Sequence, residues 1–313
     1  MTAPDASGFR ETVYACAGLY GVLFVVSTAQ LLRSCHRYRA WTTQKVLHLL
    51  LLLGCACRAS FLGCLASWWD RAAGALSPAA MSSPGAHEAF YALDELANLL
   101  FLAVFATLVL FWARVYCTSL DKAGVFAAAV EPLVRACLAA IVVGHGAFVA
   151  AHATAWRRDG ALVGRPYAVF CSTAALALAA AQLYCGVRVY AELRGVPVEL
   201  RVRMIKAREV GVLTAAWSGC YTARSFLMLW LANTRASALA GPAASACVLV
   251  YFALLEALPA IVVLYFHRRV PSSLEMLPAD LLLNSPAGQG LLSRAELQAL
   301  REEAAAADDD ARE

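Results

Sequence analysis

Long apolar stretches alternate with short polar segments along this chain. Seven of these stretches are long enough to cross a membrane as helices. They cover residues 13–32, 46–69, 91–112, 136–156, 167–187, 210–232 and 243–266. A hydrocarbon core about 30 Å thick takes about 20 apolar residues of helix to cross. Because lipid cannot hydrogen-bond to exposed backbone amides, such stretches must form helices. The pattern predicts an all-α, polytopic membrane bundle of seven transmembrane helices over residues 13–269.

Composition agrees with a membrane protein. The chain is 61% hydrophobic and 15% charged, whereas soluble proteins are about 45–50% apolar and about 25% charged. Residues 1–12 form a short flank, and the first stretch is followed by Arg33 rather than a small-residue cleavage site, so we expect a retained helix. The tail, residues 270–313, carries a capping-box pattern from Ser293 to Glu296 that predicts a short acidic helix.

The distribution of Lys and Arg between the loops predicts the orientation of the bundle. The flanks on the N-terminal side of the bundle carry six Lys and Arg residues, and those on the opposite side carry fourteen. Cytosolic loops carry an excess of Lys and Arg. The N-terminus is therefore expected in the lumen or outside the cell, and the C-terminal tail in the cytosol.

The densest part of this cytosolic charge, which we call the basic collar, lies between the fifth and sixth stretches. It comprises Arg188, Arg194, Arg201, Arg203, Lys206 and Arg208. Anionic headgroups attract such residues by about 1 kcal/mol each, so lipid contact is one interpretation and docking of a cytosolic partner is the other. Because the cations gather at the expected cytosolic face, the net charge of +4 gives no indication of nucleic-acid binding.

The eleven cysteines do not indicate disulfides. Nine lie within the apolar stretches, and Cys35 and Cys117 lie at the expected cytosolic face, which is a reducing compartment. Buried thiols behave as small apolar side chains. Cys35 and Cys117 are either palmitoylated juxtamembrane thiols or unmodified thiols without a function.

Charged residues within the apolar stretches carry the most chemical information. At about 1.5 Å per residue, Arg58, Arg224 and Glu256 lie about 18–24 Å from the nearest cytosolic charge, although they belong to three different helices. Asp94 and Glu95 lie near the lumenal boundary. Each such charge costs roughly 2.5–3.5 kcal/mol at a helix centre, so we expect a polar cluster. It is either a set of ion pairs that fixes helix packing or a polar cavity for a ligand, ion or proton.

His145 and His152 share one face of the fourth stretch, seven residues apart. A catalytic zinc site takes three protein ligands, so this pair predicts no metal site. The glycines beside His145 are expected to admit a neighbouring helix. Pro259, three residues after Glu256, removes a backbone hydrogen bond and is expected to kink the last helix.

Several short blocks resemble the tobamovirus multiplication protein family of plants. The most specific is Trp41-Thr42-Thr43-Gln44-Lys45-Val46, followed by His48. The others are residues 108–113 with Trp112, residues 208–211 with Glu209 and Gly211, Arg224, residues 251–259 with Glu256 and Pro259, and residues 268–271. These blocks are spread over almost the whole predicted membrane domain.

The resemblance implies a protein of the vacuolar membrane that binds tobamoviral replication proteins on its cytosolic side. It would thereby anchor the viral RNA-copying complex. The resemblance implies no catalytic residue and no cofactor. The wider group to which the family belongs includes orphan lysosomal seven-helix proteins of animals. We therefore expect a non-enzymatic anchor or scaffold that contacts membrane lipids and cytosolic proteins without binding nucleic acid directly. The plasma membrane or another endomembrane is the alternative location.

Two other functions fit a seven-helix bundle. An orphan G-protein-coupled receptor would have the same helix count and orientation, but the third stretch ends in Ala113-Arg114-Val115-Tyr116 without the acidic residue of the rhodopsin-like class. The seventh stretch also lacks that class's Asn-Pro-x-x-Tyr motif. A transporter of small molecules or ions would use the charged cluster.

Overall fold

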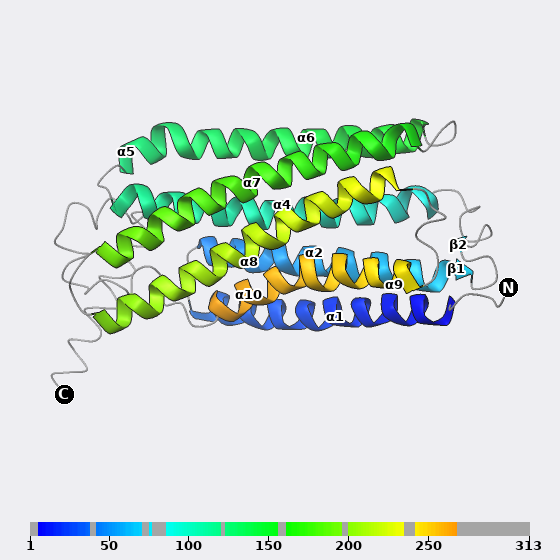
Figure 1. The fold of residues 1–313 in the computed structure, drawn as a ribbon, viewed down its shortest axis with the longest axis horizontal. Coiled ribbons are helices and arrows are strands. Elements are labelled where there is room, and N and C mark those ends of the chain that lie inside the picture. Colours follow the sequence, from blue (N-terminus) through cyan, green and yellow to red (C-terminus); the bar gives the residue numbers. More distant parts are fainter. Residues whose placement is uncertain are drawn as a thin grey trace.

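The computed structural model describes residues 6–37, 42–70, 75–76, 86–119, 123–155, 161–195, 200–234 and 242–267. Within these ranges the chain is almost entirely helical (Figure 1). The long helices are α1 (Ala6–Arg37), α2 (Thr43–Trp68), α4 (Ala86–Ser119), α6 (Glu131–Ala155), α7 (Ala161–Gly195) and α8 (Leu200–Asn233). Two rods are composite. In one, α5 (Ala123–Val125) and π-helical η1 (Phe126–Val130) lead into α6, and the other, at the end of the described chain, consists of α9 (Pro242–Val248), π-helical η3 (Leu249–Ala257) and α10 (Leu258–His267).

The seven predicted stretches correspond to the seven helical rods of the described chain, and this confirms the all-α membrane bundle. Six rods contain a helix long and apolar enough to cross a membrane. The remaining one, α8, is 34 residues long, but Arg224 and several Ser, Thr and Trp residues make it less apolar. Residues 1–5 of the N-terminal flank and the tail, with its predicted helix after Ser293, lie outside the described residues, whereas residues 6–12 of that flank belong to α1.

One predicted boundary was wrong. Trp69 was expected to end the second helix, but it begins strand β1 (Trp69–Asp70), which pairs antiparallel with β2 (Ala75–Leu76). The indole ring of Trp69 packs at a tilt against the ring of Phe9 of α1, with 4.2 Å between ring centroids. An aromatic contact and two pairs of strand residues therefore follow α2, where hydropathy alone predicted that the helix continues.

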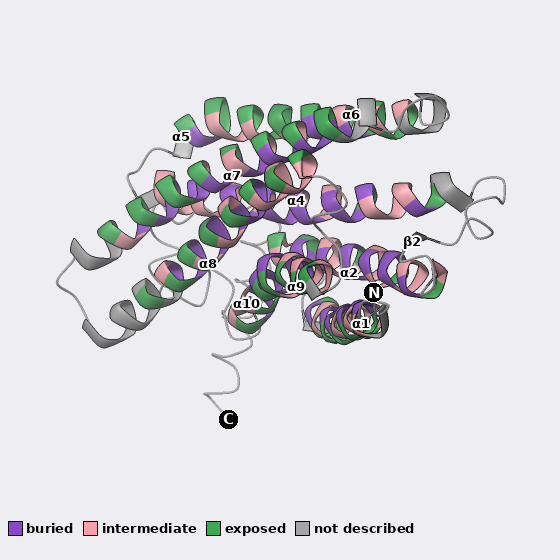
Figure 2. Ribbon diagram, turned by 45° about the vertical axis from the view of Figure 1, so that its right-hand side comes forward, coloured by how far each residue is buried: buried purple, intermediate pink, exposed green. Residues whose placement is uncertain are grey.

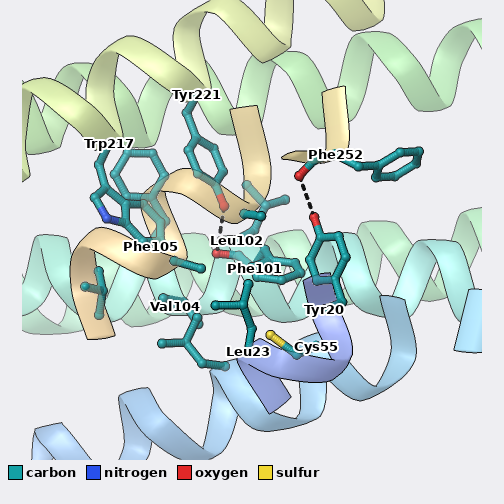
Figure 3. Packing of buried hydrophobic residues seen from close by; sticks show 14 of the residues in the cluster. Tyr20, Leu23, Cys55, Phe101, Leu102, Val104, Phe105, Trp217, Tyr221 and Phe252 are labelled. Atoms are coloured by element: carbon teal, nitrogen blue, oxygen red, sulfur yellow. Dashed lines mark hydrogen bonds between the residues drawn. The ribbon is translucent and has the colours of Figure 1, made fainter. Parts of the chain in front are cut away.

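Helix α4 lies at the centre of the bundle. In its most apolar window 56% of the residues are buried, compared with 11% for α6, which runs along the outside (Figures 1 and 2). Its buried face contributes Phe101 and Phe105 to the core, and Phe105 packs against Trp217 of α8 at 5.2 Å between ring centroids (Figure 3). The pairs α1–α2 and α7–α8 pack on either side of this central helix.

Two glycines allow close helix approach. A Cβ atom on Gly144 would overlap the ring of Phe170, and one on Gly186 would overlap the side chain of Thr214. Small residues let backbones approach in this way in membrane bundles. Gly146, which was expected to act like Gly144, has open space at the same position. The prediction therefore holds for one of the two glycines beside His145.

The last rod is broken by a π-helical segment, η3, which ends two residues before Pro259. The backbone N–H of Leu258 donates to the carbonyl of Ala253, five residues back. Pro259 has no N–H to continue the ladder, and π segments of this kind often mark functional positions in helices. Pro259 itself is buried. The rod therefore changes helix type around Glu256, next to Pro259, and the kink expected there stays a prediction.

Candidate functional site

Four helical segments bring polar side chains together in the middle of the bundle. Arg58 comes from α2, Asp94 and Asn98 from α4, Arg224 from α8 and Glu256 from η3. We call these five residues the ion cluster. The side chains of Arg58 and Glu256 are 0% exposed, and that of Arg224 is 5% exposed. The charges that the sequence placed at similar depths are thus in direct contact.

Arg58 and Glu256 form a two-point ion pair. Arg58 Nε donates to Glu256 Oε1 at 2.7 Å, and Arg58 Nη2 donates to Glu256 Oε2 at 2.9 Å. This fork matches the planar guanidinium to the carboxylate, which is the strongest arrangement available to an Arg–carboxylate pair. It joins the second and the last helical rods near the bundle's centre.

Arg224 shares the same carboxylate and contacts the same oxygen, Oε2, as Arg58 Nη2. Its Nη2 lies 2.6 Å from Glu256 Oε2 and donates to the Tyr251 hydroxyl at 2.9 Å. The Arg224 guanidinium also lies over the Tyr251 ring, 4.8 Å from its centroid. Glu256 therefore compensates two buried cations at once.

Asn98 bridges the two arginines through one oxygen. Its Oδ1 accepts from Arg58 Nη2 at 2.7 Å and from Arg224 Nη2 at 2.5 Å, and its Nδ2 donates to the Tyr167 hydroxyl at 3.2 Å. A neutral amide can do this because its carbonyl oxygen has two lone pairs. Through Asn98 the cluster also reaches α7.

Asp94 completes the charge balance. Its Oδ1 is paired with Arg58 Nη1, and its side chain is 28% exposed, more than those of the other charged members. Two guanidinium and two carboxylate groups give the cluster no formal net charge. Glu95, also expected here, is 2% exposed on α4, but adjacent helix positions point in directions about 100° apart, so it faces a different part of the bundle from Asp94.

Tyr20 of α1 ties a further helix to the cluster. Its hydroxyl lies 2.8 Å from Glu256 Oε1 and 2.9 Å from the carbonyl oxygen of Phe252 (Figure 3). The ring of Phe252 in turn lies 5.0 Å from the guanidinium carbon of Arg58. Tyr20, Asn98 and Tyr251 were missed by sequence reasoning. Asn98 alone carried a signal, since it lies one helical turn after Asp94.

This arrangement is chemically suited to holding helices together. An unpaired charge in hydrocarbon is expensive, and leaving one partner of a buried pair alone typically costs about 3–5 kcal/mol. Each of the four charged members has an opposite charge in contact. A small cavity of about 10 Å³, bordered by Asn98, Arg224 and Ser225, adjoins the cluster and has room for about one water molecule.

The buried imidazole of His145 has a contact within the protein at each of its ring nitrogens. Its Nδ1 donates to the carbonyl of Ile141 at 2.9 Å, and its Nε2 faces the Cys171 thiol, 3.7 Å from Sγ. The side chain of His152 lies outside the described residues. No group of three His, Cys, Asp or Glu side chains suited to a metal ion occurs among the residues that are described.

The block of residues 41–48 at the start of α2, which resembles the family, contains both buried and solvent-accessible side chains. Thr42 caps the helix, since its side chain accepts from the backbone N–H of Lys45 at 3.4 Å. Lys45 and His48 are buried, whereas Thr43 is exposed and Gln44 is half-buried. Trp41 lies outside the described residues.

The other predicted residues are spread along the helices. Trp112 is half-buried, and Gly211 is half-buried beside the ring of Tyr190, where an added Cβ would lie 3.6 Å away. In the basic collar, Arg188 and Arg208 are exposed. The side chains of Glu209, Arg194, Arg201, Arg203 and Lys206 are not among those described, although their backbones are helical.

Comparison with known proteins supports the resemblance found in the sequence. The chain is 28% identical over 267 residues to tobamovirus multiplication protein 1 of Nicotiana tabacum, covering 82% of this chain and 84% of the relative. It is 28% identical over 262 residues to tobamovirus multiplication protein 1 of Arabidopsis thaliana, covering 82% and 83%. Tobamovirus multiplication protein 3 of Nicotiana tabacum is also 28% identical, over 267 residues and 82% of each chain.

No solved structure matches the chain. The model of the THH1/TOM1/TOM3 domain matches residues 4–280. This match takes in the helical bundle and every member of the ion cluster, and the chain therefore belongs to the THH1/TOM1/TOM3 domain family.

Proposed function

We propose that this protein is a non-enzymatic membrane anchor that holds cytosolic proteins, including tobamoviral replication proteins, at an endomembrane. The observation that carries the proposal is the match over 82% of the chain to relatives named for tobamovirus multiplication. The vacuolar membrane is the proposed location, with the N-terminus in the lumen and the tail in the cytosol.

The ion cluster supports an anchoring role more than a transport role. Its charges are paired with one another, and its helices converge on Glu256 from α2, α8 and η3. A carrier needs a charged site that exchanges its partners for solute. A cluster that is neutral and, apart from Asp94, buried instead gives the bundle a fixed shape, which is what a docking platform requires.

The basic collar is the proposed docking surface. Arg188 and Arg208 are exposed on the ends of α7 and α8, and these two helix ends lie at the opposite end of the bundle from the N-terminus (Figure 1). Positive charge there would attract an acidic surface on a partner as well as anionic lipid.

Flotation of membranes tests the anchoring role. Membranes that contain the full chain are mixed with a purified tobamoviral replication protein and floated through a density gradient. We expect the replication protein to float with these membranes and to stay at the bottom with membranes that lack the chain. Equal distribution in both gradients would overturn the proposal.

A charge-reversal variant separates docking from general membrane charge. Replacing Arg201, Arg203, Lys206 and Arg208 by Glu should reduce flotation of the partner. The matched control reverses Arg157, Arg158 and Arg165, which the proposed topology places on the other side of the membrane. The docking surface is excluded if both variants bind the partner as the natural chain does.

A transporter is the second candidate, because the Asp94 side chain is 28% exposed and gives the cluster an open side. Reconstitution in liposomes with a pH-sensitive dye would detect proton or proton-coupled flux. A flux that disappears with Asp94→Asn would favour transport, and its absence would leave anchoring as the better account.

A further inference from the structure

A second set of buried polar residues lies along the contact between α7 and α8. On α8 it comprises Thr214, Ser218 and Ser225, spaced so that they share one face of the helix. On α7 it includes Gln182. The set is separate from the ion cluster, and the anchoring function gives it no role.

Two contacts fix the register of these antiparallel helices. Ser172 Oγ donates to the carbonyl of Ser225 at 3.2 Å, and Gly186 lies directly against Thr214. Gln182 is one turn before Gly186, and Ser218 is one turn after Thr214. Gln182 and Ser218 therefore face the same level of the α7–α8 contact.

The polar atoms around this level, on Gln182 and within one turn of α8, are buried without hydrogen-bond partners among the described residues. They are both amide atoms of Gln182, Oγ1 of Thr214, Oγ of Ser218 and Nε1 of Trp217. The four residues are between 0% and 5% exposed. Buried polar groups are rarely left without a partner, and each one so left is costly. Five such atoms, on Gln182 and within one turn of α8, indicate an occupant that supplies hydrogen bonds.

A further buried polar atom without a hydrogen-bond partner among the described residues lies beside the ion cluster. The small cavity next to Arg224 is bordered by Asn98 and Ser225, and Arg224 Nε is buried there without a partner within the described chain. Its volume of about 10 Å³ is at the lower limit for one water molecule. The positions from Thr214 to Arg224 span about 15 Å along α8.

The chemistry of these atoms selects the occupant. The Gln182 amide nitrogen and the Trp217 indole nitrogen only donate, the Gln182 amide oxygen only accepts, and the two hydroxyls do both. A metal cation would need acceptors on every side and would be repelled by the two N–H groups. Small neutral molecules that both donate and accept match the chemistry of all five atoms.

We propose that the α7–α8 contact binds a short column of ordered water molecules, held by Gln182, Thr214 and Ser218, bordered by Trp217 and continued at the cavity beside Arg224. The column extends the polar interior from the ion cluster toward the ends of α7 and α8 that carry the basic collar. The close contact of Gly186 with Thr214 closes it at that end. Water sites of this kind are an integral part of a folded structure.

Hydroxyl-radical footprinting by brief X-ray exposure tests this directly, because radicals formed from bound water label side chains that bulk solvent does not reach. The sample is the full chain in detergent. We expect rapid oxidation of Trp217, which is 0% exposed. Tyr20, also 0% exposed but with its hydroxyl already engaged by Glu256, is the reference and should be labelled several-fold more slowly.

Two variants complete the test. Gln182→Leu with Ser218→Ala removes the groups that hold water and should reduce Trp217 oxidation several-fold. Thr173→Ala, on the exposed face of α7, is the matched control and should leave it unchanged. The natural chain alone is decisive, since Trp217 labelling no faster than that of Tyr20 overturns the proposal even if the double variant does not fold. Undiminished labelling in a folded double variant also overturns it.

Discussion

Arg58 and Glu256 are 198 positions apart in the sequence, yet they meet through two hydrogen bonds of 2.7 and 2.9 Å at the centre of the bundle. The carboxylate also compensates Arg224 at 2.6 Å. Glu256 is therefore the residue on which the packing of three helical rods depends. Its position in the π-helical segment η3 brings an otherwise apolar rod into this network.

The first prediction is that Glu256→Gln strongly destabilises the bundle. The substitution leaves two buried guanidinium groups with Asp94 as the remaining carboxylate of the cluster, and breaking a buried pair from one side costs about 3–5 kcal/mol in soluble proteins. The loss is measured as a lower midpoint of thermal unfolding in detergent. Glu131→Gln, at an exposed ion pair with Arg135, is the control and should change the midpoint little.

A double-mutant cycle then assigns the partners. Arg58→Met combined with Glu256→Gln should be less damaging than the sum of the two single changes, because it removes a cation together with its carboxylate. The coupling of Glu256 with Arg58 should exceed that with Arg224, which keeps its contacts with Tyr251 and Asn98. Additive effects in both cycles would contradict the shared ion pair.

The second prediction concerns Asn98. Asn98→Leu removes the oxygen that accepts from both arginines and should destabilise the bundle, since each guanidinium loses a buried acceptor. Asn98→Asp keeps that oxygen and adds a negative charge beside two cations, so it should retain more of the stability. Unfolding midpoints of the two variants in the same detergent give the comparison. An aspartate as damaging as leucine would show that the amide nitrogen, which donates to Tyr167, is the important group.

The sequence predicted the helices and the charged members of the cluster for one physical reason. Burying Arg58, Arg224 or Glu256 in lipid is so costly that counting residues from the membrane edge was enough to place them together. Asn98, Tyr20 and Tyr251 could not be found in this way. Uncharged polar side chains are tolerated throughout membrane helices, and their roles depend on which helices are neighbours.

Other features depend on details that hydropathy does not encode. A uniformly apolar stretch has no polar face whose spacing would reveal the change from α to π geometry at η3. Gly144 and Gly146 look alike in the sequence, but only the first lies beneath an aromatic ring. The polar residues Thr214, Ser218 and Ser225 of α8 are not unusual for a membrane helix in the sequence alone. Their arrangement becomes apparent only when the register with α7 places Gln182 opposite Ser218.

The third prediction uses these two glycines as a matched pair. Gly144→Ala should destabilise the contact between α6 and α7, because the added methyl group would overlap the ring of Phe170. Overpacking of this kind typically costs about 1–3 kcal/mol. Gly146→Ala, two residues away in the same helix, meets open space and should be neutral or slightly stabilising. Thermal unfolding of both variants decides it, and equal effects would contradict the close packing at Gly144.

The last prediction concerns orientation, which rests on the fourteen Lys and Arg residues on one side and six on the other. Because cytosolic loops retain positive charge, a protease-cleavable tag at the C-terminus should be removed from sealed microsomes or intact vacuoles. A tag at the N-terminus should be protected until detergent is added. The reverse pattern would overturn the proposed orientation, and with it the docking surface at the basic collar. Equal accessibility of both tags would contradict an odd number of membrane crossings and would require one of the seven helical rods, α8 being the least apolar, to lie outside the lipid.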